Sequence, residues 1–365
     1  MVIMALDHVR LFIGASAFSP LDLSQTSIAF FLTRWITHFC APVFVFLAGT
    51  SAYLYARNTG CDLKTLSKFL IIRGIWIILV EVLILNLVVQ FLPYQFLALQ
   101  VLWIIGWSMI ILGVLIHLPK SVILTLSLLL IFGHNLLDYF FAEKDGWFYA
   151  FLHKQKMFPT NPIPIVIQYP LLPWPGVMAL GYLFGRLLVR PSPNRNWAIW
   201  SIGLLCVVLF LTLRGINFYG DPVPWEVQSR GPEYTVLSFL NTSKYPPSLL
   251  FLLMTLGPSL LIIPWLEKWQ GLKVKFIGIF GKVPFFFYLV HFLIIHLMAI
   301  AWSQWQFGVS EWWLGPVSGF PEGYEFNLLR IYGAWILVVI ICYPLCRWYA
   351  KYKRTHKEQW WLSYL

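Results

Sequence analysis

Four residues near the start of the chain, Asp7-His8-Val9-Arg10, bring three ionisable side chains into otherwise apolar sequence. Charged side chains are costly inside a bilayer, so such a cluster indicates a functional site. Histidine is the usual general base, because its pKa lies near the pH at which enzymes work. Adjacent side chains on a helix point about 100° apart, so a carboxylate that orients His8 has to come from another helix. The sequence thus predicts a base at His8; the alternative is a helix end solvated by water.

A second pair of polar side chains, Arg34 and His38, lies four residues apart in an apolar run. This spacing puts both on one face of a helix, and a neighbouring cation keeps a histidine unprotonated, as a base requires. The alternative is a packing histidine beside an arginine whose charge reaches the membrane surface. Glu81 stands near the middle of another apolar run, where structural pairing, a proton relay and substrate contact all remain open.

A polar, proline-rich stretch, Asn241-Thr-Ser-Lys-Tyr-Pro-Pro, precedes a later apolar run. Its amide, hydroxyl, ammonium and aromatic groups are suited to binding a sugar. The candidate substrate-binding residues here are Asn241, Ser243, Lys244 and Tyr245.

Two histidines, His291 and His296, lie in one apolar run with upstream aromatic residues. Five positions put them on different faces of a helix, so a metal site made by this pair is not expected. His291 is expected to face the protein interior. The cysteines do not form a four-ligand metal set, and Cys342 and Cys346, one helical turn apart, are interpreted as packing residues. No metal is therefore predicted.

The composition indicates which elements must position these side chains. The chain has 365 residues, of which 59% are hydrophobic and 11% charged, whereas soluble domains carry about 25% charged residues. This predicts an all-α, polytopic membrane protein. The net charge of +11 is distributed over loops that alternate along the chain, which argues against a nucleic-acid partner.

A spanning helix needs about 20 apolar residues. The chain is expected to form about ten transmembrane helices, and the first one, which carries His8, is truncated because only six residues precede Asp7. A connecting segment is predicted at 21–31. The other predicted spans are 34–55, 74–92, 96–116, 122–140, 171–189, 197–213, 248–266, 283–302 and 328–346. The helix bundle therefore covers 1–346, followed by a basic, aromatic tail at 347–365.

Lysine and arginine placement predicts the orientation of the helices, because cytoplasmic loops carry an excess of both. A basic loop at 57–73 and the basic tail are assigned to the cytoplasm, where the tail suits anionic lipid. His8 then lies at or just below the outer face. The longer outer loops, which are long enough to shape a substrate site, are predicted at 141–168, 217–247 and 303–325.

Five segments together resemble a known family of membrane enzymes. They are MALDHVR, THFCAPVFVFLAGTSAYL, LLPWPGVMALGYLFG, NTSKYPPSLLFLLMTLGP and GKVPFFFYLVHFLIIH. In this order they are similar to bacterial membrane proteins that resemble the catalytic domain of heparan-α-glucosaminide N-acetyltransferase, within a wider group that includes sugar O-acetyltransferases. The resemblance covers nearly the whole chain. It implies transfer of an acyl group, expected to be acetyl, from cytoplasmic acyl-CoA to a glycan or lipid-linked acceptor outside the cytoplasm.

The same resemblance ranks the candidate bases. In the sugar O-acetyltransferase branch, a basic residue, ten further residues and then a histidine stand at the end of the first helix. His8 matches that histidine, and the basic residue would fall upstream of Met1, as expected if the start was assigned too late. The lysosomal enzyme has asparagine at the position of His8 and a catalytic histidine further along. This chain has no histidine between His8 and His38, so His8 is the first candidate and His38 the second.

The predicted function is membrane-bound acyl transfer with His8 as general base on an acceptor hydroxyl or amine, directly or through an acyl-histidine. The residues that position groups or stabilise developing charge are Arg34, His38 and Arg10. The substrate-binding candidates also include Asp7, Glu81 and His291, and the CoA phosphates would meet Arg57, Arg73 and Lys282. The bacterial inner membrane and a cytoplasmic C-terminus are expected.

Two other functions remain open on the sequence alone. One is a non-enzymatic carrier or flippase for a lipid or small solute that uses the same intramembrane charges. The other is a structural partner subunit with the activity in another chain. The sequence is compatible with a homo-oligomer and leaves the acceptor and the acyl chain open.

Overall fold

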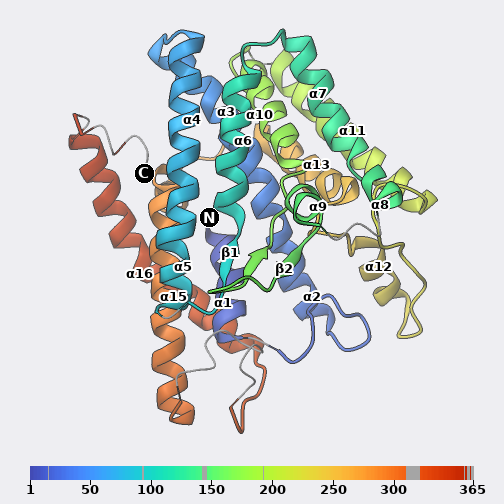
Figure 1. Ribbon diagram of the computed structural model, residues 1–365, viewed down its shortest axis with the longest axis vertical. Coiled ribbons are helices and arrows are strands. Elements are labelled where there is room, and N and C mark those ends of the chain that lie inside the picture. The colour runs from blue at the N-terminus through green and yellow to red at the C-terminus, as the bar shows by residue number, and fades with distance from the viewer. Residues whose placement is uncertain are drawn as a thin grey trace. The chain divides into compact units, whose positions relative to one another are not determined.

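The apolar runs of the sequence form helices in the computed structural model (Figure 1). The structure describes residues 1–365 except 15, 93, 142–145, 192, 310–320, 357, 360, 361 and 363–365. Parts of two predicted outer loops, 142–145 and 310–320, and the end of the predicted tail therefore lie outside the described residues.

Six helical runs in the described part of the chain are long and apolar enough to cross a membrane. They are Ile28–Thr59, Leu63–Gln90, Asn194–Ile216, Leu249–Leu266, Pro284–Phe307 and Leu328–Thr355. Two further apolar helices, Val101–Leu115 and Lys120–Gly133, are shorter. These runs support an integral membrane protein. Of the roughly ten predicted spans, the structure supports six.

Contacts between residues divide the chain into two units. Unit 1 comprises residues 1–40, 87–93 and 269–365, and unit 2 comprises 41–86 and 94–268. Unit 1 contains α1 (Val2–Ile13), α2 (Ile28–Trp35), the 3₁₀ helix η1 (Ile36–Phe39), most of α5 (Asn86–Gln90), α14 (Leu272–Lys282), α15 (Pro284–Phe307) and α16 (Leu328–Thr355). Within it, α1 packs against α15, α16 and η1.

Unit 2 is built around two closely packed helix pairs, α4 with α6 and α11 with α13, and α10 packs against α6 and α7. Its helices are α3 (Cys40–Thr59, without Cys40), α4 (Leu63–Leu79), the π-helix η2 (Val80–Leu85), α6 (Val101–Leu115), α7 (Lys120–Gly133), α8 (Leu136–Phe140), α9 (Trp147–Leu152), α10 (Trp174–Leu188), α11 (Asn194–Ile216), α12 (Pro232–Leu240) and α13 (Leu249–Leu266). Figure 1 shows α4 and α6 side by side.

Unit 2 also holds a small sheet, so the fold is mostly α rather than all-α. The strands are β1 (Leu97–Leu99), β2 (Lys156–Phe158) and β3 (Ile165–Ile167). The order is β1-β3-β2, with β1 parallel and β2 antiparallel to β3. Strands of three residues are too short to produce an alternating pattern that sequence reasoning could detect.

Three predicted boundaries are wrong. The predicted basic loop at 57–73 becomes helical at Leu63, because the Asp62 carboxylate accepts a hydrogen bond from the Thr65 N–H at 3.0 Å and caps α4. The predicted connection at 21–31 becomes helical at Ile28, where the Ser27 hydroxyl caps α2 by accepting from the Phe30 N–H. The last helix continues to Thr355, nine residues beyond its predicted end at 346.

Glu81 pairs with the backbone at the start of α6. Its fully buried carboxylate accepts the N–H groups of Gln100 and Leu102 at 3.0 and 2.9 Å. These donors belong to the first turn of the helix, which leaves its N–H groups without intrahelical partners and favours negative charge. Of the three alternatives for Glu81, this geometry supports structural pairing.

Glycines allow two helices of unit 2 to touch through their backbones. A Cβ at Gly49 in α3 would lie 1.9 Å from the carbonyl oxygen of Met178 in α10, and one at Gly181 in α10 would lie 1.9 Å from that of Phe46. Thr50 Oγ1 donates to the Gly181 carbonyl at 3.0 Å. The small residues around Gly49 thus allow α3 and α10 to approach closely.

We expect Gly49→Ala to lower stability by about 1–3 kcal/mol, because the added methyl group meets a backbone atom that cannot rotate away. The thermal unfolding midpoint of the purified protein in detergent measures this. Gly133→Ala in α7 is the matched control, since a Cβ there has nothing within 4 Å. Equal midpoints for the two variants would contradict the packing described.

Candidate functional site

His8 lies on α1, where it stacks on aromatic rings of α15. Its ring centroid is 4.0 Å from that of Phe292 and 4.9 Å from that of His291, both at an interplanar angle of 28°. His8 Nδ1 is 2.7 Å from His291 Nε2. From the sequence, a carboxylate that orients His8 would have to come from another helix. The partner does come from another helix, but it is an imidazole.

The proton positions in this pair follow from the next contact. Nδ1 of His291 lies 2.8 Å from the carbonyl oxygen of Phe287, one turn earlier in α15. A carbonyl only accepts, so His291 Nδ1 carries the hydrogen and Nε2 carries a lone pair in the neutral ring. His8 Nδ1 must then be the donor to His291. In the neutral pair, this leaves the lone pair of His8 on Nε2, which is the form that accepts a proton from a substrate.

Asp7 is held by two arginines. Arg10 donates to Asp7 Oδ1 through Nε at 3.2 Å and Nη2 at 3.0 Å. Arg34 of α2 donates to Asp7 Oδ2. The side chains of all three are 11–16% exposed. Two guanidinium groups and one carboxylate leave a net charge of +1 on the α1–α2 contact.

Arg34 and His38 do not share one regular helical face. The α-helix ends at Trp35, and the 3₁₀ helix η1 (Ile36–Phe39) carries His38. With about three residues per turn, a 3₁₀ helix rotates His38 away from the position that an i,i+4 spacing predicts. His38 is fully buried, and η1 packs against α1. Its role as the second base stays a prediction.

His291 and His296 point to different partners on α15. His291 is fully buried against His8, as its predicted interior position requires. His296 Nδ1 lies 2.7 Å from the carbonyl oxygen of Val88, and its ring stacks on Phe91 at 4.2 Å. Within the described residues, no cluster of three or more His, Cys, Asp or Glu side chains could hold a metal ion.

The polar stretch 241–245 in unit 2 is fixed by a buried ion pair that sequence reasoning missed. Arg214 Nη1 lies 3.9 Å from Asp221 Oδ1, with both side chains 1% exposed. The Arg214 guanidinium donates to the carbonyl oxygen of Asn241 at 2.9 Å, and Asp221 accepts the Ser243 N–H at 2.9 Å. Burial raises the pKa of Asp221, against the effect of its hydrogen bonds and of Arg214. The detectable signal was an arginine closing an apolar run seven residues before an aspartate.

Lys244 and Tyr245 continue this stretch. Lys244 is 7% exposed, and its Nζ lies 5.3 Å from the centre of the Tyr245 ring. The Tyr245 hydroxyl donates to that of Tyr169 at 3.2 Å. The four sugar-binding candidates Asn241, Ser243, Lys244 and Tyr245 therefore lie in one ordered turn, and their substrate role stays a prediction.

Of the three residues predicted to meet CoA phosphates, two lie at helix ends and Arg73 is half-buried within α4. Arg57 is exposed in the last turn of α3, and Lys282 is exposed at the end of α14. Arg73 lies on α4 with its guanidinium 5.8 Å from the centre of the Phe69 ring. Their contact with a phosphate stays a prediction.

We expect the Asp7–Arg34 pair to show strong energetic coupling in a double-mutant cycle. Asp7→Asn leaves Arg10 and Arg34 close together without their carboxylate, and Arg34→Gln leaves one arginine on Asp7. Each single change should destabilise the protein, and the double variant should lose less than the sum, with a coupling of about 0.5–3 kcal/mol. Chemical unfolding in detergent measures it. Additive single effects would contradict the pairing.

A comparison with protein families finds one match. The model described as "Heparan-alpha-glucosaminide N-acetyltransferase, catalytic" matches residues 1–219, which is more than half of the chain. The matched region contains His8, Arg34 and His38, whereas His291 lies beyond it. A comparison with curated proteins finds no match. The chain therefore belongs to the family of heparan-α-glucosaminide N-acetyltransferase catalytic domains.

Proposed function

We propose that this membrane protein transfers an acetyl group from acetyl-CoA to a hydroxyl or amine of a glycan or lipid-linked acceptor, with His8 Nε2 as the general base. Membership of a transmembrane acetyltransferase family supports the reaction class. The observation that carries the assignment of His8 is the hydrogen-bonded chain from His8 through His291 to the Phe287 carbonyl.

The first step is proton removal from the acceptor. His8 Nε2 takes the proton as the acceptor oxygen or nitrogen attacks the thioester carbonyl carbon. The C–S bond then breaks, the new C–O or C–N bond remains, and the imidazolium of His8 returns the proton to the leaving thiolate of CoA. If Nε2 attacks the thioester itself, the acetyl group resides on His8 before the acceptor takes it.

His291 supports the base in two ways. It accepts the Nδ1 hydrogen of His8, which keeps the lone pair on Nε2. When Nε2 gains a proton, the positive charge on His8 Nδ1–H strengthens the bond to His291, since charge-assisted hydrogen bonds are stronger than neutral ones. Phe292 stacks on His8 and holds the ring plane. In this proposal His291 positions the base and does not bind the substrate.

The Asp7–Arg10–Arg34 cluster supplies positive charge next to the base in sequence. Its net charge of +1 suits a developing oxyanion or a phosphate of the donor. Asp7 holds both guanidinium groups in place through Oδ1 and Oδ2. This arrangement supports the positioning role predicted for Arg10 and Arg34.

The donor would approach from the cytoplasm. The alternation of basic segments supports a cytoplasmic position for Arg57, Lys282 and the C-terminus. Arg57 and Lys282 would meet CoA phosphates there, and Arg73, which lies within α4, is the third candidate. The acceptor is modified on the other side of the membrane, which in a bacterial cell is the outer face of the inner membrane.

We expect His8→Ala to lower acetyl transfer by about 100-fold to 10,000-fold, the usual contribution of a general base. His291→Phe keeps an aromatic ring but removes the acceptor for His8 Nδ1–H. Leaving this donor unsatisfied costs about 1–3 kcal/mol, so we expect the rate to fall by about 5-fold to 150-fold. Release of the CoA thiol by the purified protein, with membrane glycan extract as acceptor, measures both.

His296→Phe is the matched control, because His296 is also buried on α15 but bonds to Val88. It should keep activity close to that of the unaltered protein. Full activity of His8→Ala at normal expression would contradict the mechanism.

Absence of acetyl-CoA binding at millimolar concentration would contradict the enzyme assignment and favour a carrier. Mass spectrometry of envelope glycans with and without the gene should show loss of an increment of about 42 Da and identify the acceptor.

A further inference from the structure

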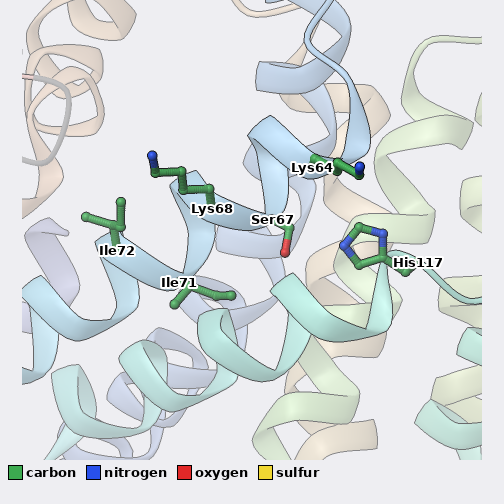
Figure 2. A pocket seen from close by; sticks show the side chains of 6 residues that line it. All are labelled: Lys64, Ser67, Lys68, Ile71, Ile72 and His117. Carbon is green, nitrogen blue, oxygen red and sulfur yellow. The ribbon is translucent and has the colours of Figure 1, made fainter.

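A groove of about 380 Å³ opens between α4 and the end of α6, outside the site described above (Figure 2). Its lining residues are Lys64, Ser67, Lys68, Ile71, Ile72 and His117. The five residues of α4 recur at helical spacing and so occupy one face, and His117 follows α6. Two lysines and a histidine above two isoleucines give the groove a basic end and an apolar end.

The floor of the groove is rigid because the two helices touch there. Ser67 Oγ donates to the carbonyl oxygen of Gly113 at 2.7 Å, and a Cβ at Gly113 would lie 3.2 Å from the Ser67 carbonyl oxygen. Further along, Gly74 and Gly106 face each other, with a Cβ on either glycine falling within 2.6 Å of the other's carbonyl oxygen. The Ser67 hydroxyl is thus engaged, and the lysines supply the groove's charge.

No carboxylate among the described residues lies within ion-pair distance of Lys64 or Lys68. The nearest acid in sequence, Asp62, already accepts the Thr65 N–H as the cap of α4. Figure 2 shows Lys64 extending to the side of α4 where His117 lies, and Lys68 to the side of Ile72. The two ammonium groups thus lie on opposite sides of α4, so each side of the groove can attract an anionic group.

The apolar end identifies the source of that anion. Below Lys68, α4 exposes Ile72, Ile75, Trp76 and Leu79, which are 40–48% exposed and recur at the spacing of one helical stripe. This stripe belongs to the candidate span Leu63–Gln90, so it is the surface that acyl chains would cover. Lys68 lies one turn before Ile72 on the same stripe. A ligand that fits has a negative head at Lys68 and an apolar body along Ile72.

We propose that this groove binds the phosphate headgroup of an anionic phospholipid of the surrounding bilayer. Lys68 contacts the phosphate, Lys64 adds positive charge on the other side of the groove, and the acyl chain lies along the Ile72–Leu79 stripe. The site is independent of acyl transfer and of the residues proposed for it. The bound lipid would hold the start of α4 and the end of α6 at the membrane surface.

The test is phosphatidylglycerol binding to the purified full-length protein in detergent, measured by native mass spectrometry. Lys64→Gln with Lys68→Gln should weaken binding about thirty-fold, which corresponds to about 1 kcal/mol per lysine near a membrane surface. Phosphatidylcholine, whose headgroup has no net charge, should bind weakly to both proteins. If the double variant does not fold, each single variant should weaken binding about five-fold.

Lys268→Gln with Lys275→Gln is the matched control, because it removes two exposed lysines that do not line the groove. It should bind phosphatidylglycerol as the unaltered protein does. An equal loss in this control would overturn the proposal in favour of general electrostatic attraction. Unchanged binding in the Lys64/Lys68 variant would also overturn it, and so would displacement of the lipid by equimolar CoA, which would assign the groove to a soluble phosphate.

Discussion

Polar groups buried among apolar helices must find their hydrogen-bond partners inside the protein, because a bilayer supplies none. This constraint explains where the charged residues of this chain lie. Asp7 joins two arginines, Glu81 accepts the first N–H groups of α6, and Arg214 donates to the backbone carbonyls of Val223 and Asn241 on either side of α12. Each of these side chains holds a helix end or a connection in place. The same need for a partner brings His8 to His291.

The His8–His291 contact shows how a structural requirement becomes a chemical property. Two neutral imidazoles can share a hydrogen in either direction, and the direction decides which nitrogen of His8 is basic. Here the Phe287 carbonyl removes the ambiguity, because it can only accept. The position of α1 on α15 therefore determines both where the His8 ring lies and which of its nitrogens carries the lone pair.

The sequence was sufficient for the membrane class, the family and the candidate residues, since apolar runs and isolated charges can be read directly. It could not supply the partner of His8, because His291 lies 283 positions away and only packing brings the two together. The sequence did not predict the start of α4, because the basic residues after Asp62 are typical of a loop and conceal the helix cap at Asp62. The three-residue strands were too short to produce an alternating pattern.

The acceptor at the end of the histidine chain is a main-chain atom, and this has a consequence for sequence variation. No substitution at position 287 removes the carbonyl oxygen while α15 remains helical. The direction of the hydrogen bonds from His8 to His291 to Phe287 therefore depends on one turn of main chain and not on the side chain at position 287. Relatives could diverge widely along α15 and keep the same basic nitrogen, provided that a histidine remains at each of the two ring positions. The hydrogen-bonded arrangement therefore tolerates substitution at position 287 and depends on the side chains of His8 and His291 alone.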